Sequence, residues 1–415
     1  MFSFVHAADI HLDSPMLRLD EYDGAPVSRI RQATRRALDN MVHLAISEKV
    51  NFVLISGDLY DGDWKDYNTG LFFISRMARL VEAGIPVYII AGNHDAANRM
   101  TKSLSLPDGV KLIGSRSPAT FMLENIGVAI HGQSFPTQAV KIDLSEKYPP
   151  AVNGFFNIGM LHTCATGSKE HDPYAPCSIE GLRLKGYDYW ALGHIHKRQV
   201  LCEDPPILFP GNLQGRSIKE SGPKGCVLVK VEKDRPAYEF HALDVIRWVL
   251  CEADVTGEET EQGFFEKVMN SVSAVAADTD IPMLVRVNAV GTCPIHDRIA
   301  SDLERLVGEV RAGTISLYPD RIWIEKVRLN TSPLPQEAPE RSGGPIELLL
   351  NLIEEIGTDP NELAGLGSSL TDLWEKLPLE IRNSEAAVSP NDTETIGRLL
   401  AEVRPMLIQR LGISK

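Results

Sequence analysis

The chain has 415 residues, of which 43% are hydrophobic and 24% are charged, a composition typical of a soluble globular protein with two or three domains. The first residues form no basic and apolar leader, and no run approaches the roughly 20 apolar residues of a membrane span. We therefore expect neither a secretory signal nor membrane association. Six cysteines without CxxC spacing argue against a disulfide framework or a cysteine zinc site, so we expect reduced thiols in a cytoplasmic protein.

Residues 1–242 alternate short apolar runs with amphipathic stretches. A strand that ends just before Asp9 is followed by a predicted helix over 29–49 and a second strand over 50–56. A helix over 71–84 and a third strand continue this order. Further strands are predicted at 127–132, 156–163, 187–194 and 225–232. The order predicts parallel strands with helices on the sheet faces, and the smaller number of helices later in the segment favours a layered α/β sandwich with a mixed sheet.

A second and smaller α+β unit is predicted over 243–332, where strands and helices alternate in the order βαβαβ. Residues 333–345 combine Pro, Gly and polar side chains, the composition of a linker. Residues 346–415 have the pattern of short amphipathic helices. The chain is therefore predicted to consist of a large N-terminal domain, a small α+β domain, a linker and a C-terminal helical region.

Five short polar segments follow predicted apolar strands. They are Asp9-Ile10-His11, Gly57-Asp58, Gly92-Asn93-His94-Asp95, Leu161-His162-Thr163 and Gly193-His194-Ile195-His196. Ligand crevices of α/β sheets form at the carboxyl ends of strands, and a two-residue spacing in an extended segment puts both side chains on one face. Any one of these segments alone is better explained as a turn or a polar loop. Together they supply carboxylates, an amide and imidazoles, a set suited to Mn²⁺, Fe²⁺ or Zn²⁺.

The same five segments, in this order over residues 4–230, resemble the calcineurin-like metallophosphoesterase superfamily. The resemblance implies a four-layer αββα sandwich and a centre of two divalent ions, with Mn²⁺ expected first and Fe²⁺ or Zn²⁺ as alternatives. It implies that one ion is held by Asp9, His11, Asp58 and His196. It implies that the other is held by Asp58, Asn93, His162 and His194. A carboxylate shared by two ions suits a pair that clamps one phosphate.

Two further residues near the predicted ligands receive catalytic roles from this resemblance. His94 matches the histidine of the superfamily that is not a ligand and that stabilises or protonates the leaving oxygen. Asp61 matches the carboxylate that orients this histidine in related phosphatases. We therefore expect His94 and Asp61 to act as a catalytic pair beside the two ions.

Within the superfamily, the chain resembles the SbcD-type DNA repair exonucleases, and among them the YhaO-like branch. The segments AADIHLDSP and FPGNLQGRSIKESGPKGCVLV carry this resemblance, and Gly62 stands where related protein phosphatases have a phosphate-gripping Arg. The predicted unit over 243–332 resembles the capping domain of these nucleases. The resemblance implies a 3′→5′ DNA exonuclease that also cuts single strands internally, with Arg216 and Lys219 near the path of the phosphate.

The resemblance also implies a partner, a coiled-coil ATPase of the SbcC type, bound by the C-terminal helices. Packing on the chain's own core or a homodimer contact explains these helices equally well. No phosphate-binding loop of an ATPase occurs in the sequence. The net charge of −14 counts against DNA binding, although 14 acidic against 7 basic residues fall at 336–415 and bound cations offset part of the remainder. Two alternatives therefore stay open, a small-molecule or cyclic-nucleotide phosphodiesterase and a metal-bearing scaffold that binds DNA ends.

Overall fold

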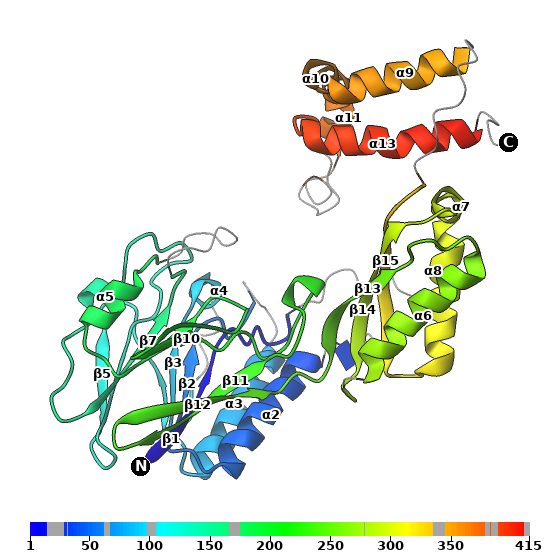
Figure 1. Ribbon diagram of the computed structural model, residues 1–415. Coiled ribbons are helices and arrows are strands. Elements are labelled where there is room, and N and C mark those ends of the chain that lie inside the picture. The colour runs from blue at the N-terminus through cyan, green and yellow to red at the C-terminus, as the bar shows by residue number, and fades with distance from the viewer. Residues whose placement is uncertain are drawn as a thin grey trace. The chain divides into compact units, whose positions relative to one another are not determined.

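The computed structural model describes residues 1–14, 29–30, 32–61, 67–97, 105–165, 175–277, 279–334, 345–377, 382 and 389–410. The chain forms two compact units (Figure 1). The first contains Met1–Cys251, Val272–Val287 and Arg311–Val327, and the second contains Glu252–Ser271, Asn288–Val310 and Arg328–Lys415.

The first large sheet has six strands in the order β12-β11-β1-β2-β3-β4. Its strands are β1 (Phe2–Ala7), β2 (Phe52–Ser56), β3 (Val87–Ile90), β4 (Val110–Leu112), β11 (Gly225–Glu232) and β12 (Arg235–Ala242). Strands β1 to β4 are parallel, whereas β11 runs antiparallel to β1. Strands β2 and β3 are buried along their whole length, which explains why their sequences are continuously apolar instead of alternating.

The second large sheet also has six strands, in the order β5-β6-β7-β8-β10-β9. Its strands are β5 (Ala119–Leu123), β6 (Val128–Gly132), β7 (Phe156–His162), β8 (Tyr189–Gly193), β9 (Gln199–Glu203) and β10 (Pro206–Phe209). Strands β6, β7, β8 and β10 are parallel, and the outer strands β5 and β9 are antiparallel to their neighbours.

The two sheets pack face to face and are covered on their outer sides. Phe4 and Phe52 from the first sheet share one apolar cluster with Ile158 and Tyr189 from the second. The other face of the first sheet packs against α2 (Ala33–Ser47) and α3 (Tyr67–Glu82), which lie side by side in Figure 1. The other face of the second sheet packs against α5 (Ile179–Leu184) and the segment around the short helix η2 (Ser145–Lys147). The predicted α/β sandwich is confirmed.

A third sheet, of order β13-β14-β15, follows in the chain. Its strands are β13 (Arg247–Asp254), β14 (Met283–Thr292) and β15 (Ile322–Ser332), and its helices are α6 (Glu261–Ala277), α7 (His296–Ser301) and α8 (Leu303–Leu317). The C-terminal helices are α9 (Pro345–Thr358), α10 (Pro360–Ser369), α11 (Thr371–Lys376) and α13 (Thr393–Arg410). Most of the predicted linker lies at 335–344, outside the described residues. Among the helices described, none combines the length and apolar character that a membrane span requires.

Candidate metal centre

The seven predicted ligands lie at the carboxyl ends of parallel strands of the two large sheets. Asp9 and His11 follow β1, Asp58 follows β2, and Asn93 opens the short helix α4 (Asn93–Ala97) after β3. His162 is the last residue of β7, and His194 and His196 follow β8. All of them are buried except His196, whose side chain is 22% exposed. Two packed sheets thus bring together side chains that are up to 187 positions apart in the sequence, between Asp9 and His196.

The backbone at four of these residues lies in the left-handed region. The φ angles are 50° at Asp9, 44° at His11, 52° at Asp58 and 105° at His194. Side chains with a Cβ rarely adopt this region, and each such residue costs on the order of 1–3 kcal/mol. The turn after β1 keeps its shape because the N–H of Asp9 and His11 donate to the carbonyls of Gly57 and Asp58. Residues in this conformation cluster at functional sites, so four of them close together mark this region as a candidate site.

Glycines precede three of the ligands, Asp58, Asn93 and His194, because no larger residue fits. A Cβ on Gly57, where φ is +94°, would lie 2.3 Å from Nδ1 of His162. A Cβ on Gly193 would lie 1.8 Å from the carbonyl oxygen of Ser56. These contacts give the Gly-Asp and Gly-His pairs of the sequence a steric cause, since the two sheets meet here with backbone against side chain.

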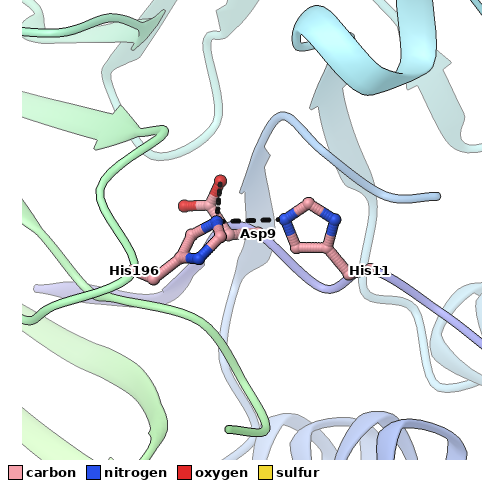
Figure 2. Close-up of side chains that lie close together, drawn as sticks. All are labelled: Asp9, His11 and His196. Carbon is pink, nitrogen blue, oxygen red and sulfur yellow. Dashed lines mark hydrogen bonds and ion pairs between the residues drawn. The ribbon is translucent and has the colours of Figure 1, made fainter. Parts of the chain in front are cut away.

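The first cluster of candidate ligand atoms contains Asp9, His11 and His196, whose side chains point toward one another in Figure 2. The two Nε2 atoms of the histidines are 3.1 Å apart, and Nε2 of His196 is 4.0 Å from Oδ1 of Asp9. Nδ1–H of His196 donates to Glu220 over 2.7 Å, so a neutral His196 presents the lone pair of Nε2 to the cluster. A lone pair, a carboxylate and a second imidazole directed at one point form a cation site.

The second cluster contains Asp58, His162 and His194, and a further group of close ligand atoms, from His11, Asp58 and His94, shares one residue with each of the two clusters. Nδ1–H of His162 donates to the carbonyl of Ser56 over 2.9 Å, and Nε2 lies 3.0 Å from Oδ1 of Asn93 and 3.5 Å from Oδ2 of Asp58. When Nε2 gives up its proton, three acceptors face one another. Such an arrangement is stable when a cation lies among them.

Asp58 connects the two clusters. Its Oδ2 is 3.5 Å from Nε2 of His162 and 3.9 Å from Nε2 of His11, and its Oδ1 accepts from the N–H of His94 over 3.0 Å. Burial raises the pKa of Asp58, but the imidazoles around it, that of His162 first, outweigh burial and hold the pKa well below its usual range. Asp58 is therefore a carboxylate that faces both clusters, as the sequence predicts for a bridging ligand.

The protonation of the centre shows that it favours added positive charge. Burial raises the pKa of Asp9 to about 6. Burial alone would lower the pKa of His162, but the negative charge of Asp58 and Asp9 raises it to about 9. At neutral pH the imidazole of His162 thus holds a proton that a divalent cation would replace, whereas the carboxyl of Asp9 takes one up only in weak acid. The donor set and its electrostatics fit the two ions implied by the sequence.

His94 and Asp61 lie side by side at the open edge of the centre. Nδ1 of His94 is 3.0 Å from Oδ1 of Asp61, and the side chain of His94 is 35% exposed. The hydrogen bond to Asp61 raises the pKa of His94. The other oxygen of Asp61 accepts from the hydroxyl of Ser14 over 2.5 Å. The structure thus brings together the pair that the sequence assigns to catalysis, with the histidine accessible and the carboxylate fixed behind it.

Two residues that hold the centre in place were missed by the sequence analysis. The carboxylate of Asp95 accepts from the backbone N–H groups of Leu59, Tyr60 and Gly92, so it braces the turns after β2 and β3. Its place next to His94 in the Gly-Asn-His-Asp segment is a signal that could have revealed it. Glu220, which orients His196, lies 24 positions further along the chain in a segment without periodicity, and no such signal exists there.

The two basic residues predicted near the phosphate path occupy different environments. Arg216 lies within the centre, 3.4 Å from Asp61 and 3.1 Å from Glu220, with its side chain 18% exposed. Lys219 lies on the short helix η3 (Ile218–Glu220) with an exposed side chain. The structure thus brings Arg216 into direct contact with two carboxylates beside the ligands, and it places Lys219 three residues further along the chain.

Comparison with known proteins gives the chain its family. Residues 2–198 match the calcineurin-like phosphoesterases, and residues 248–332 match the middle domain of the metallophosphoesterase YhaO. The uncharacterized metallophosphoesterase YhaO of Bacillus subtilis is 37% identical over 296 residues, which cover 70% of this chain and 72% of that protein.

More distant relatives carry the name DNA double-strand break repair protein Mre11. The protein from Sulfurisphaera tokodaii is 29% identical over 262 residues, 58% of this chain and 62% of its own length. The protein from Sulfolobus acidocaldarius is 24% identical over 402 residues, 92% of this chain and 94% of its own length. Calcineurin-like phosphoesterases use a dinuclear site of divalent metal ions, and this chain has clusters of candidate ligands for one. The chain belongs to the calcineurin-like metallophosphoesterases of the SbcD/Mre11 superfamily, in the same family as YhaO.

Proposed function

We propose that this phosphoester hydrolase is a Mn²⁺-dependent DNA phosphodiesterase of DNA repair and recombination, a 3′→5′ exonuclease that also cuts single strands internally. The observation that carries the proposal is the position of Asp58, which faces both clusters of ligand atoms while the His94–Asp61 pair lies at their accessible edge. The relatives named for DNA double-strand break repair support DNA as the substrate.

The ligands proposed for the two ions follow the two clusters. One ion would be held by Asp9, His11, Asp58 and His196, and the other by Asp58, Asn93, His162 and His194. When bound, such a pair supplies Lewis-acid stabilisation of the charge that builds up on a phosphodiester during in-line displacement. The hydrogen bonds from His162 to Ser56 and from His196 to Glu220 hold the imidazoles in the tautomer that this role requires.

His94 handles the proton of the leaving group. In its protonated form, Nδ1–H donates to Asp61, so the proton on Nε2 is the one free to move to the leaving oxygen as the P–O bond breaks. Asp61 keeps the ring in this orientation, and its negative charge stabilises the imidazolium. The attacking water forms the new P–O bond and loses a proton to solvent, and His94 takes a proton back from solvent after each turnover.

A diester suits the charge around the centre better than a terminal phosphate does. The guanidinium of Arg216, the cationic side chain that the described structure places against Asp61, is already engaged by two carboxylates. A phosphate monoester carries close to two negative charges at neutral pH and is usually gripped by an available arginine. Position 62, where related phosphatases carry that arginine, lies outside the described residues.

We also propose that the C-terminal helices bind a coiled-coil ATPase of the SbcC type in the cytoplasm. Leu348 and Leu352 lie one turn apart on α9 and are 71% and 51% exposed, and Leu373 on α11 is 61% exposed. Apolar side chains at this spacing form the stripe with which a helix contacts a partner helix. A homodimer contact through the same leucines is the competing explanation, and the molar mass of the chain alone in solution distinguishes the two.

Digestion of end-labelled DNA tests the proposed substrate. With Mn²⁺, single- and double-stranded DNA labelled at the 5′ end should be converted into a ladder of shortened strands, whereas a 3′ label should be released at once as a mononucleotide. Intact DNA together with hydrolysis of cyclic nucleotides or bis-p-nitrophenyl phosphate would make the chain a small-molecule phosphodiesterase. Salt-dependent binding to DNA ends without cleavage of any ester would make it a scaffold.

Asp61→Asn is expected to lower turnover by about 10- to 100-fold while both ions stay bound, because Asp61 orients His94 and is not a proposed ligand. The pH dependence of the rate should also change. Protonated His94 is the active form, so the rate falls as the pH rises through the pKa of His94. Because Asp61 raises the pKa of His94, the rate of Asp61→Asn should begin to fall at a lower pH than that of the wild type. The pH–rate profile and elemental analysis check both points, with Asp39→Asn, at an ion pair on α2, as the control. Loss of metal from Asp61→Asn would contradict the assignment.

A further inference from the structure

Arg216 lies between the catalytic pair and a metal-ligand histidine. Its Nη1 is 3.4 Å from Oδ2 of Asp61 and 3.3 Å from the hydroxyl of Ser14. Its Nη2 is 3.1 Å from Oε1 of Glu220 and 3.4 Å from Nδ1 of His196. The two ends of one planar guanidinium therefore point to two different carboxylates.

Each of these carboxylates fixes one histidine of the centre. Oδ1 of Asp61 is 3.0 Å from Nδ1 of His94, and Oε1 of Glu220 is 2.7 Å from Nδ1 of His196. A continuous series of contacts thus runs from His94 through Asp61, Arg216 and Glu220 to His196. It joins the proposed proton donor to a proposed metal ligand without passing through the ions.

The segment that carries Arg216 is held at several points. Glu220 accepts from the backbone N–H of Arg216 over 2.7 Å and from the side-chain amide of Asn212 over 2.9 Å. The indole N–H of Trp248 donates to the carbonyl of Gly215, and the N–H of Gly222 donates to the carbonyl of Trp248. A Cβ on Gly215 would lie 2.7 Å from the carbonyl of Glu220, which shows how closely the turn packs. Arg216 is thus fixed by its backbone as well as by its side chain.

The contacts of the Arg216 guanidinium argue against a role in binding phosphate. An arginine that binds phosphate uses neighbouring N–H groups as a bidentate donor toward the ligand. Both Nη atoms of Arg216 already face Asp61, Ser14 and Glu220, and the side chain is 18% exposed. A phosphate would have to displace a carboxylate from the guanidinium in order to bind there.

We infer that Arg216 is a positioning residue that couples the orientation of His94 to that of His196 by holding Asp61 and Glu220 at a fixed separation. This role rests on the proposed function, since it presumes that His196 is a metal ligand. The fork shape of the guanidinium matters here, because two carboxylates on opposite sides need two separate donor atoms. The single ammonium of a lysine supplies one point of charge and cannot reproduce the pair.

The test compares Arg216→Gln, Arg216→Lys and wild type in the full-length chain. Mn²⁺ affinity is measured by titration calorimetry on chelator-stripped protein, and kcat and KM are measured with bis-p-nitrophenyl phosphate. We expect both variants to bind Mn²⁺ roughly tenfold more weakly and to lose kcat, with KM within about twofold of wild type. Arg198→Gln is the matched control, because Arg198 is exposed and stacks on Phe240. It should change none of these values.

Two results would overturn the inference. The first is a raised KM with unchanged kcat and Mn²⁺ affinity in Arg216→Gln, since a phosphate-binding residue gives that pattern. The second is full recovery of kcat and Mn²⁺ affinity in Arg216→Lys, since charge alone would then suffice. Thermal melting of the stripped proteins identifies a variant that fails to fold. If Arg216→Gln fails to fold, Arg216→Lys decides the question: weaker Mn²⁺ binding and a lower kcat support the inference, and wild-type values overturn it.

The proposed function and this inference can fail separately. Wild-type protein that binds Mn²⁺ but leaves DNA intact contradicts the proposed substrate, while the Mn²⁺ affinities of the variants still decide the role of Arg216. Wild-type protein that binds no Mn²⁺ contradicts both.

Discussion

Asp58→Asn is expected to reduce phosphodiester hydrolysis by at least about 10³-fold and to leave the chain unable to hold two ions. Asp58 is the carboxylate that faces both clusters, 3.5 Å from His162 and 3.9 Å from His11. Two ions contribute several kcal/mol of transition-state stabilisation, and each 1.4 kcal/mol lost is about tenfold in rate. The substitution keeps the size of the side chain and an oxygen that can accept from the N–H of His94. The expected loss of activity therefore comes from the missing negative charge and not from a change in the shape of the side chain.

Elemental analysis and hydrolysis of bis-p-nitrophenyl phosphate measure the effect of Asp58→Asn. Asp244→Asn is the matched control, because Asp244 is equally buried but pairs with Arg247 away from the centre. The control should keep two ions and its activity, even if its stability falls. Two tightly bound ions and near-normal turnover in Asp58→Asn would contradict the bridging role.

His94→Ala is expected to slow DNA cleavage by about 10²- to 10⁴-fold while both ions stay bound, the range of loss for a general acid. The effect should depend on the leaving group. The oxygen of a deoxyribose leaves poorly and needs a proton, whereas p-nitrophenolate leaves readily without one. His94→Ala should therefore slow hydrolysis of bis-p-nitrophenyl phosphate far less than hydrolysis of DNA, by less than about tenfold.

The ratio of these two losses separates proton donation from a general disturbance of the centre. His43→Ala serves as the control, because His43 is an exposed residue of α2. Equal losses on both substrates would show that His94 contributes binding or metal retention, and the role of proton donor would then be abandoned. Elemental analysis of the same samples shows which of the two applies.

The ligand set could be predicted from the sequence because each member follows a buried parallel strand. Such strands are continuously apolar, as in β2 and β3, and their ends meet at one edge of a sheet. Spacing grouped Asp9 with His11 and His194 with His196, and placement after apolar strands brought all five segments together; the family resemblance then divided the ligands between two ions. The spacing argument assumed extended segments, and this assumption was wrong, because φ is positive at Asp9, His11 and His194. The left-handed backbone at four ligands could not be predicted position by position, because Asp and His are enriched in this region but still adopt negative φ at most positions.

Several strands of the sandwich escaped prediction for a physical reason. Strands β5 and β9 lie at the edges of the second sheet, and their residues are mostly exposed or half-buried. In β5 exposed and half-buried positions alternate, but apolar side chains stand at both kinds of position, so the alternation is not visible in the sequence. The contacts of Glu220 and Arg216 could not be predicted from the sequence either. They depend on a turn whose carbonyl at Gly215 accepts a hydrogen bond from Trp248, a residue of the later strand β13.

Part of the acidic charge of the chain belongs to the metal centre. Asp9 and Asp58 are buried among imidazoles, and Asp61 and Glu220 are paired with Arg216, so these four carboxylates serve the site and do not repel a substrate from the surface. Bound divalent ions would make the centre a local positive region in a chain of net charge −14. The overall charge is therefore a poor guide to what the site binds.

The central claim, that one carboxylate joins two metal positions, is tested most directly by anomalous scattering from crystals of the full-length chain grown with Mn²⁺. We expect two anomalous peaks about 3.5–4 Å apart, both adjoining Asp58. One peak should adjoin His11 and His196, and the other should adjoin Asn93 and His162. A single peak, or two peaks of which one lies away from Asp58, would contradict the claim.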